Sequence, residues 1–240
     1  MATLFISDLH LDPDRPDITA QALELLRSEA AGARALYILG DLFEAWVGDD
    51  DPEPEKRKVI AALKSLSEGG LPCYFMRGNR DFLVGDGFAA ESGCRLLEDP
   101  TVADMYGTPV LLMHGDTLCT DDVEYQAFRR AVRDPRWQAG MLARPLEERL
   151  AVARQLREQS AASMAGKAEE IMDVNQDAVV AAMRAHGVYT MVHGHTHRPA
   201  VHRFTVDGHD AVRIVLGDWY EQGSVLAWDE DGFDLRTLPR

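Results

Sequence analysis

Residues 3–10 of this 240-residue chain read Thr-Leu-Phe-Ile-Ser-Asp-Leu-His, a short apolar run followed at once by polar residues. Residues 35–41, Ala-Leu-Tyr-Ile-Leu-Gly-Asp, repeat this plan, and residues 72–79, Pro-Cys-Tyr-Phe-Met-Arg-Gly-Asn, repeat it again. Helical patterns separate the three runs, at residues 17–31 and 54–68. Strands that alternate with helices indicate a parallel sheet of the α/β class, because parallel neighbours need a crossover connection.

A long helical segment later interrupts the strand pattern. Residues 81–92 are predicted to form a short helix, and residues 121–186 have helical spacing rich in Ala, Leu, Arg and Glu. Further strands are expected at residues 94–97, 101–106, 110–113, 190–193, 201–206 and 211–216, with a closing hairpin of residues 224–228 and 233–237. The sequence therefore predicts a core of residues 1–120 and 187–240, into which a helical block of residues 121–186 is inserted.

The composition is that of a globular protein. Hydrophobic residues make up 46% and charged residues 27% of the chain, which excludes a disordered or fibrous protein. Apolar runs stay well short of the roughly 18–20 residues that a membrane-spanning helix needs, and we expect no signal peptide at the N-terminus. The three cysteines are odd in number and lack CxxC spacing, so we expect reduced thiols in a cytoplasmic protein.

The net charge of −15 argues against general nucleic-acid binding, which needs a basic surface. The charge is unevenly spread: residues 121–167 hold nine basic and seven acidic side chains, a net +2, so the remainder carries −17. A basic segment on an acidic protein suits an anionic ligand or an anionic membrane surface. A helix face with internal ion pairs is the alternative interpretation.

Residues of the kinds that bind metals follow five of the predicted strands. Asp8 and His10 are two apart, as are His195 and His197, and residues with this spacing on an extended chain point to one side. The other three segments are Gly40-Asp41, Gly78-Asn79-Arg80-Asp81 and His114-Gly115-Asp116. Each segment alone is also typical of a turn or a helix cap. Together they indicate one site, because ligands bind beyond the carboxyl ends of strands in open α/β sheets.

The five segments supply two aspartates, one asparagine and four histidines as candidate ligands. Such a mixed oxygen and nitrogen set suits Mn²⁺, Fe²⁺ or Zn²⁺ rather than Ca²⁺, and the residue types do not decide among the three metals. Seven ligands are too many for one ion but fit two. A carboxylate such as Asp41 could bridge two cations about 3.5–4 Å apart, the spacing of two-metal hydrolytic sites.

These ordered motifs resemble those of the calcineurin-like metallophosphoesterase superfamily, and the resemblance covers the chain apart from the helical block. It implies a four-layer αββα sandwich with a dinuclear metal centre and an inserted helical lid. It also implies that Asp41 is shared between two metals. The full implied ligand sets are Asp8, His10, Asp41 and His197 for one metal, and Asp41, Asn79, His114 and His195 for the other.

One position departs from the superfamily pattern. Members usually carry a histidine after the asparagine of the third motif, often assigned as the acid that protonates the leaving group. This chain has Arg80 there, and arginine does not act as an acid near neutral pH, whereas it binds phosphate through two parallel hydrogen bonds. A phosphate that leaves from a pyrophosphate needs no protonation. The departure therefore favours pyrophosphate cleavage over phosphoprotein hydrolysis.

The opening Ser7-Asp8-Leu9-His10-Leu11, the stretch from Gly78 to Leu83 and the inserted block are similar to those of one family within the superfamily. Its members are the pyrophosphatases that act on UDP-2,3-diacylglucosamine in the lipid A synthesis of Gram-negative bacteria. This resemblance implies hydrolysis to UMP and 2,3-diacylglucosamine 1-phosphate (lipid X), by attack of a metal-bound hydroxide on the α-phosphorus. It also implies two Mn²⁺ ions and peripheral attachment to the cytoplasmic face of the inner membrane. We expect no obligate protein partner.

The same resemblance assigns residues to the substrate. Ser160, Met164 and Lys167 fall at i, i+4 and i+7, which is one face of a helix. Some relatives have a polar side chain where this chain has Met164, so we expect packing or a backbone contact there. An apolar groove for the acyl chains is expected between lid and core. The implied contacts of the head group are Asn79, Arg80, Asp122, Ser160, Met164, Lys167 and His195.

Catalytic roles are implied for Asp41, Asn79, Arg80 and His195. Asp116, two residues after a candidate ligand, is predicted to orient a ligand imidazole. Two other functions stay open from the residues alone. One is a metallophosphoesterase of soluble nucleotides or phosphodiesters, and the other is a metal-bound scaffold without catalysis.

Overall fold

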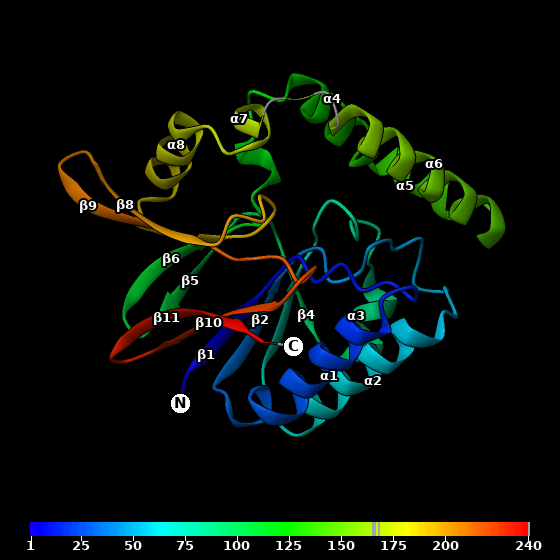
Figure 1. Ribbon diagram of the computed structural model, residues 1–240, viewed down its shortest axis with the longest axis horizontal. Helices are drawn as coiled ribbons and strands as arrows, with labels where there is room; N and C mark the ends of the chain where they lie inside the picture. The colour runs from blue at the N-terminus through cyan, green and yellow to red at the C-terminus, as the bar shows by residue number, and fades with distance from the viewer. Residues whose placement is uncertain (165–166, 168, 240) are drawn as a thin grey trace.

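Two β-sheets face each other in the computed structural model, which describes residues 1–164, 167 and 169–239 (Figure 1). The first sheet has the order β11-β10-β1-β2-β3-β4 and the second has the order β5-β6-β7-β9-β8. The first sheet consists of β1 (Thr3–Ile6), β2 (Ala35–Leu39), β3 (Cys73–Met76), β4 (Arg95–Leu97), β10 (Gly223–Asp229) and β11 (Gly232–Leu238). The second consists of β5 (Thr101–Met105), β6 (Thr108–Leu112), β7 (Thr190–His193), β8 (Ala200–Val206) and β9 (His209–Val215).

Each strand that carries a motif has at least one parallel neighbour. In the first sheet β1, β2, β3 and β4 are parallel, with Thr3 opposite Ala35 and Leu36 opposite Cys73. In the second sheet β6, β7 and β9 are parallel, and antiparallel strands close both edges. The loops that follow the parallel strands therefore emerge at the same end of each sheet.

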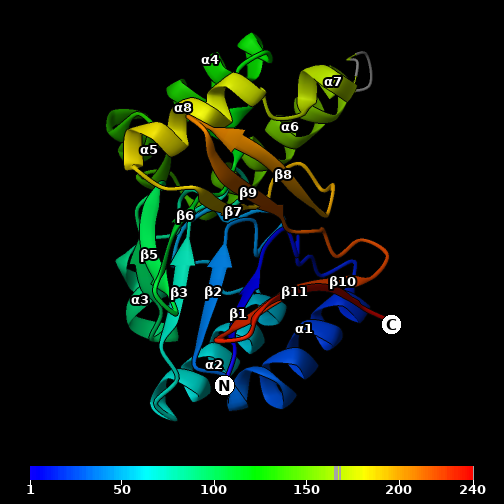
Figure 2. The same ribbon diagram turned by 90° about the vertical axis from the view of Figure 1, so that its left-hand side faces the viewer.

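Helices cover the outer face of each sheet, as Figures 1 and 2 show. The first sheet is covered by α1 (Pro16–Ser28), α2 (Pro54–Glu68) and α3 (Asp86–Ser92), and the second by α8 (Gln176–His186). Helix α2 begins with a proline and is capped by Glu53, whose carboxylate accepts hydrogen bonds from two backbone N–H groups. This order of layers is an αββα sandwich, so the predicted fold is confirmed.

Three apolar clusters hold the four layers together. The first lies between α1–α3 and the first sheet, with Ile18 and Phe75 fully buried. The second lies between the sheets and includes Phe5 from one and Ile214 from the other. In the third, Met183 of α8 packs on the second sheet. The three cysteines are free and buried.

The inserted block stands over the end of the sandwich at which the motif-bearing loops emerge (Figure 1). Its helices are α4 (Val123–Val132), α5 (Pro135–Leu142), α6 (Leu146–Met164) and α7 (Glu169–Met172). Buried Arg149 joins the block to the core, because its Nη1 donates to the Val47 carbonyl at 2.6 Å. Since α8 lies within residues 121–186 yet packs on the second sheet, the division into core and lid stays a proposal.

Two helix boundaries differ from the predicted ones. Helix α3 begins at Asp86 rather than near residue 81, because the Asp81 carboxylate is buried and accepts backbone N–H groups of the preceding loops. Helix α6 ends at Met164, so Lys167 lies beyond it and the predicted face through Ser160, Met164 and Lys167 is wrong at its last member. Within the described residues, none of the helices combines the length and apolarity that crossing a bilayer requires.

Truncating Met183, which is fully buried beneath the second sheet, tests the outer layer. Met183→Ala should lower the free energy of unfolding by about 2–5 kcal/mol, since a buried methionine leaves a cavity when truncated. Urea denaturation measures the change. The control Val201→Ala, at an exposed position of β8, should change it by less than about 0.5 kcal/mol. Equal effects of the two variants would contradict the packing of α8.

Candidate metal centre

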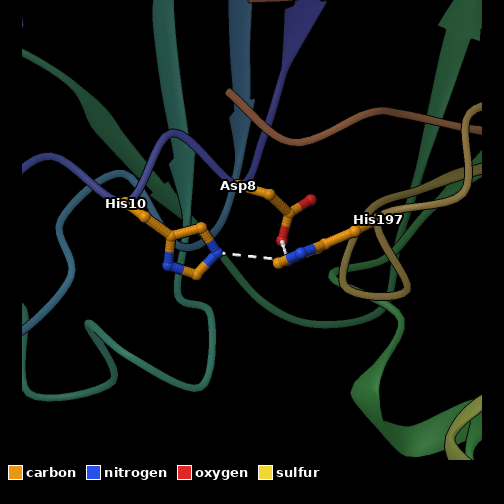
Figure 3. Close-up of side chains that lie close together, drawn as sticks. All are labelled: Asp8, His10 and His197. Carbon is orange, nitrogen blue, oxygen red and sulfur yellow. Dashed lines mark hydrogen bonds and ion pairs between the residues drawn. The ribbon is translucent and has the colours of Figure 1, made fainter. Parts of the chain in front are cut away.

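The loops after β1, β2, β3, β6 and β7 bring their polar residues to one place between the two sheets. Figure 3 shows the first group, in which Asp8, His10 and His197 point toward one another from segments far apart in sequence. The His10 Nε2 atom lies 3.1 Å from His197 Nε2, and His197 Nε2 lies 3.5 Å from Asp8 Oδ1. Asp41 joins this group, with its Oδ2 3.8 Å from His10 Nε2.

The second group surrounds Asn79. Its Oδ1 atom lies 2.9 Å from His114 Nε2 and 2.8 Å from His195 Nδ1. The same Asp41 Oδ2 that approaches His10 also lies 3.8 Å from His114 Nε2. The structure therefore brings together all seven of the predicted ligands, with Asp41 between the two groups.

The arrangement fits a divalent cation. The ligand atoms of Asp8, His10 and His197 lie within 4.8 Å of one another, and so do those of Asp8, Asp41 and His114. Most of these side chains are buried, and they combine carboxylate oxygens with imidazole nitrogens, the donor set of Mn²⁺, Fe²⁺ and Zn²⁺ sites. The residues thus support a divalent-metal site, while the number and identity of the ions belong to the proposals below.

Backbone strain concentrates at these residues. Asp8, His10, Asp41, His195 and His197 all have positive φ angles, between 49° and 70°, a region that residues other than glycine rarely occupy. Among the described residues, seven residues other than glycine have a positive φ angle, and five of these seven are candidate ligands. Strain of this kind costs on the order of 1–3 kcal/mol per residue and is typical of functional sites.

Two glycines allow the loops to approach one another. A Cβ atom at Gly78 would lie 2.1 Å from the Asp41 Oδ1 atom, and one at Gly194 would lie 2.2 Å from the Asp8 Oδ2 atom. Both distances are far below contact distance, so any larger residue would push a candidate ligand out of place. The glycines of the Gly-Asn and Gly-His motifs are therefore needed for close packing around the carboxylates.

Two acidic residues that the sequence analysis missed support the ligands. Glu44 Oε2 lies 2.9 Å from His10 Nδ1, the ring atom that faces away from His197. Asp81 is buried and accepts hydrogen bonds from the backbone N–H groups of Leu42 and Gly78, each at 2.8 Å. Burial, followed by the Asp41 charge, raises the pKa of Asp81 to about 6. A signal for Asp81 was present next to the Gly-Asn motif, whereas nothing in the local sequence marks Glu44.

The pKa values of two histidines in the metal centre are shifted in opposite directions. Burial acts to lower the pKa of His114, but the nearby carboxylates of Asp41, Asp116 and Asp8 outweigh burial and raise it to about 9. His195 behaves oppositely, because burial and the neighbouring His114 lower its pKa to about 4. Burial also opposes ionisation of Asp8, yet the surrounding histidines hold the pKa of that carboxyl well below its usual range. The buried carboxylates thus attract positive charge, as a cation site requires.

The predicted substrate residues lie in two places. Arg80 is at the centre: its backbone N–H donates to Asp41 Oδ1 at 2.7 Å, and its buried Nε has no partner among the described residues. Asp122 caps α4 and pairs with Lys167, whose Nζ lies 2.7 Å from its Oδ1 atom. Ser160 is half-buried on α6. The side chain of Met164 lies outside the described residues, so the expectation for that position stays open.

Asp116 does not hold an imidazole as predicted. Its Oδ2 atom accepts hydrogen bonds from Tyr125 Oη at 3.0 Å and from Arg129 Nε at 2.7 Å. The Tyr125 ring packs against the His195 ring, with centroids 5.7 Å apart. The donors of helix α4 bind the Asp116 carboxylate in place of a ligand imidazole. Asp116 therefore affects the centre through its charge and through its contact with Tyr125.

This fold and this group of side chains define a metal-dependent phosphoesterase. The family model of calcineurin-like phosphoesterases matches residues 1–199. The chain therefore belongs to the calcineurin-like phosphoesterase family. A solved structure described as a novel archaeal phosphodiesterase has the same fold, with a TM-score of 0.51 and 12% identity over 99% of this chain and all of that one.

Curated relatives match the chain over its length. A protein from Stenotrophomonas maltophilia (strain K279a) is 56% identical over the whole of both chains, and it is named UDP-2,3-diacylglucosamine hydrolase. Proteins with the same name from Marinobacter nauticus and Serratia proteamaculans are 57% and 53% identical. These matches cover 92% and 100% of this chain, and 91% and 100% of the respective relatives.

Glu44 should tune metal affinity through His10. Glu44→Ala removes the acceptor that fixes the ring, so we expect the affinity for Mn²⁺ to fall about 10–100-fold. Glu44→Gln keeps an acceptor and should lose less. Calorimetric titration of metal-free protein measures both, with Glu68→Ala as a control at an exposed helix end. Wild-type affinity in Glu44→Ala would show that this contact does not orient His10.

Proposed function

We propose that this protein hydrolyses the pyrophosphate bond of UDP-2,3-diacylglucosamine, releasing UMP and 2,3-diacylglucosamine 1-phosphate. The observation that carries the proposal is full-length identity of 53–57% to proteins named for hydrolysis of this compound, combined with a buried cluster of metal-ligand side chains. The presence of all seven candidate ligands favours a catalyst over a scaffold. The matches to these relatives cover 92–100% of this chain and so include most or all of the inserted block. A phosphoesterase of soluble nucleotides would not need such a block.

Two divalent cations, which we propose to be Mn²⁺, would be held by the two groups of side chains. When bound, such ions lower the pKa of water and neutralise charge on phosphoryl oxygens. The proposed ligand sets are Asp8, His10, Asp41 and His197 for one ion, and Asp41, Asn79, His114 and His195 for the other. The contact of Asp41 with both groups, at 3.8 Å in each case, supports its role as the shared ligand.

Arg80 supplies the fixed positive charge beside the reacting phosphates. Its guanidinium lies near Glu44, at 3.7 Å, and its Nε has no hydrogen-bond partner within residues 1–164, 167 and 169–239, so a donor is available for a phosphoryl oxygen. Arg80, Asn79 and His195 would stabilise charge that develops on the phosphate in the transition state. Asp41 completes the proposed catalytic group by fixing the Arg80 backbone through the 2.7 Å hydrogen bond.

The lid would hold the rest of the substrate. Asp122 and Lys167, which form an ion pair, together with Ser160 and Met164, are proposed contacts of the sugar head group. A cavity of about 340 Å³ separates α4 and α5 from the loop after β3. Apolar Phe82, Leu83 and Leu142 line part of this cavity, which suits an acyl chain.

Phosphorus NMR of the reaction in ¹⁸O-labelled water tests the function. The diacylated UDP-sugar should give UMP and the sugar 1-phosphate, with the label in UMP because the α-phosphorus is attacked. The deacylated UDP-sugar should be a much poorer substrate. Label in the sugar phosphate would contradict attack at the α-phosphorus, and equal rates on both substrates would contradict the lipid specificity.

Asp41→Ala should abolish turnover, because both groups of ligands lose a member. We expect a fall of more than about 100-fold together with loss of bound metal, measured by elemental analysis. Asp14→Ala, which changes an exposed acid, is the control. Retention of about a tenth or more of the activity in Mn²⁺ buffer would contradict the shared-ligand assignment.

Replacing Arg80 should separate turnover from metal binding. Arg80→His should lower turnover of the UDP-sugar strongly while metal content stays near that of the wild type. Arg80→Lys keeps the charge but not the two-pronged geometry, and it should recover little activity. A large loss of metal in Arg80→His would show that Arg80 supports the ligands instead.

We propose that the lid contacts the inner membrane from its cytoplasmic side. Val123, Phe128 and Leu142 are exposed on α4 and α5, and nearby Arg130 and Arg136 are exposed without an ion pair to any described residue. Apolar side chains bordered by unpaired cations suit an anionic lipid surface.

Vesicle sedimentation tests this contact. Arg130→Gln combined with Arg136→Gln should weaken binding to phosphatidylglycerol vesicles roughly 25-fold, at about 1 kcal/mol for each charge. The control pair Arg27→Gln and Arg203→Gln, exposed away from the lid, should change it little. Equal losses in both pairs would indicate attraction by net charge alone rather than by the lid.

A further inference from the structure

A second cavity lies beside the loop that carries His195 and His197. Its volume is about 210 Å³, and it opens where the loop enters the β8–β9 hairpin. This is smaller than the roughly 300–1,000 Å³ of pockets that enclose an entire drug-sized ligand, so the space fits one moiety of a larger molecule. The polar groups of its wall come from Asp173, Thr196, Arg198, His202 and Arg213.

Arg213 is the most unusual group in this wall. Its side chain is 6% exposed, and no described carboxylate lies within ion-pair distance of it. Its Nη1 donates to His193 Nε2 at 3.1 Å, and its buried Nε has no hydrogen-bond partner among the described residues. His193 Nδ1 lies 2.8 Å from the Gly194 carbonyl oxygen, so Nδ1 carries the proton and Nε2 is the acceptor of the Arg213 hydrogen bond. The buried Arg213 guanidinium therefore has a donor for a ligand that presents a hydrogen-bond acceptor.

Thr196 connects the cavity to the metal centre. It lies between His195 and His197 in the chain, and its Oγ1 atom is buried without a hydrogen-bond partner in the part of the chain that the structure describes. The cavity and the centre therefore share one short segment of backbone. A nucleotide whose α-phosphate is held at the centre has its base about one ribose away from that phosphate.

Asp173 adds a hydrogen-bond acceptor to the wall. The Asp173 carboxylate is paired with Arg198 Nη1 at 2.7 Å and also receives the Val174 backbone N–H. The wall therefore offers an acceptor, Asp173, beside the donors of Arg213 and Thr196. This combination suits a ligand that offers an N–H to an acceptor and carbonyl oxygens to donors, which is the edge of a uracil ring.

We infer that this cavity receives the uracil base of the nucleotide substrate, with Arg213 and Thr196 facing its carbonyl oxygens and Asp173 facing its N–H. The inference rests on the proposed function and adds the part of the site that selects the nucleotide. Cytosine presents an amino donor where uracil has a carbonyl oxygen, so it would set donor against donor. A site of this kind discriminates by leaving buried polar groups unpaired when the wrong base binds.

Calorimetric titration of the Mn²⁺-loaded protein with UMP, CMP and ribose 5-phosphate tests the inference. We expect UMP to bind at least about 10-fold more tightly than either of the others, a difference of about 1.4 kcal/mol. Thr196→Val removes a hydroxyl at nearly constant volume, and Ala200→Leu fills the cavity without touching a polar group. Each variant should reduce the preference for UMP over CMP to within about threefold.

Kinetics separate base binding from catalysis in the same variants. With the UDP-sugar, each should raise KM more than it lowers kcat, since the base is remote from the reacting phosphorus. Thr205→Val makes the same change as Thr196→Val at an exposed position of β8 and should leave the UMP preference unaltered. A wild-type preference that both cavity variants retain would overturn the inference, as would equal binding of UMP and CMP to the wild type.

The two proposals fail in different ways. If the wild type hydrolyses the diacylated UDP-sugar but binds UMP and CMP alike, the function stands and the uracil subsite is wrong. If it prefers UMP through Thr196 but does not hydrolyse that substrate, the cavity is a uracil site and the proposed function is wrong.

Discussion

The structure depends on the packing of buried carboxylates against imidazoles where five strands end. Asp8 and Asp41 are almost wholly removed from solvent, which is unfavourable for ionised groups unless positive charge and N–H donors surround them. The chain supplies part of that compensation: the His195 N–H donates to Asp8 and the Arg80 N–H donates to Asp41. The remaining negative charge is what makes the cluster a site for divalent cations.

The packing of the sandwich stabilises the strained backbone of this cluster. Parallel strands in both sheets deliver their loops to one end, and the apolar cluster between the sheets, which includes Phe5 and Ile214, fixes the distance between those loops. Positive φ angles at five candidate ligands could not persist on isolated loops, because each is unfavourable by itself. Gly78 and Gly194 then allow the loops to meet.

Much of this arrangement could be predicted because its signals are local. The bounds of α2 and β7 agree with the predicted ones, since Pro54 and Gly69-Gly70 mark the ends of the helix and an apolar run marks the strand. The ligands could be predicted because each directly follows a strand. Contacts between distant segments could not be predicted from local patterns. Glu44 contacts His10 from 34 positions away, and the Asp116 carboxylate accepts hydrogen bonds from donors on α4.

In the lid and in the cavity, as in the metal centre, residues that are distant in the sequence meet in the fold. Asp122 and Lys167 are 45 positions apart and meet only because the inserted helices fold back over the core. Thr196 and Arg213 likewise come together through the β8–β9 hairpin. Each buried polar atom near the centre that lacks a partner among the described residues, including Arg80 Nε, is a position at which a ligand would complete the hydrogen bonding.

Anomalous diffraction from crystals soaked in Mn²⁺ would locate the bound ions. We expect two manganese peaks, one beside His10 and His197 and the other beside Asn79, His114 and His195, with the Asp41 carboxylate between them. A single peak, or peaks that Asp41 does not contact, would contradict the claim that these loops converge to hold a pair of ions.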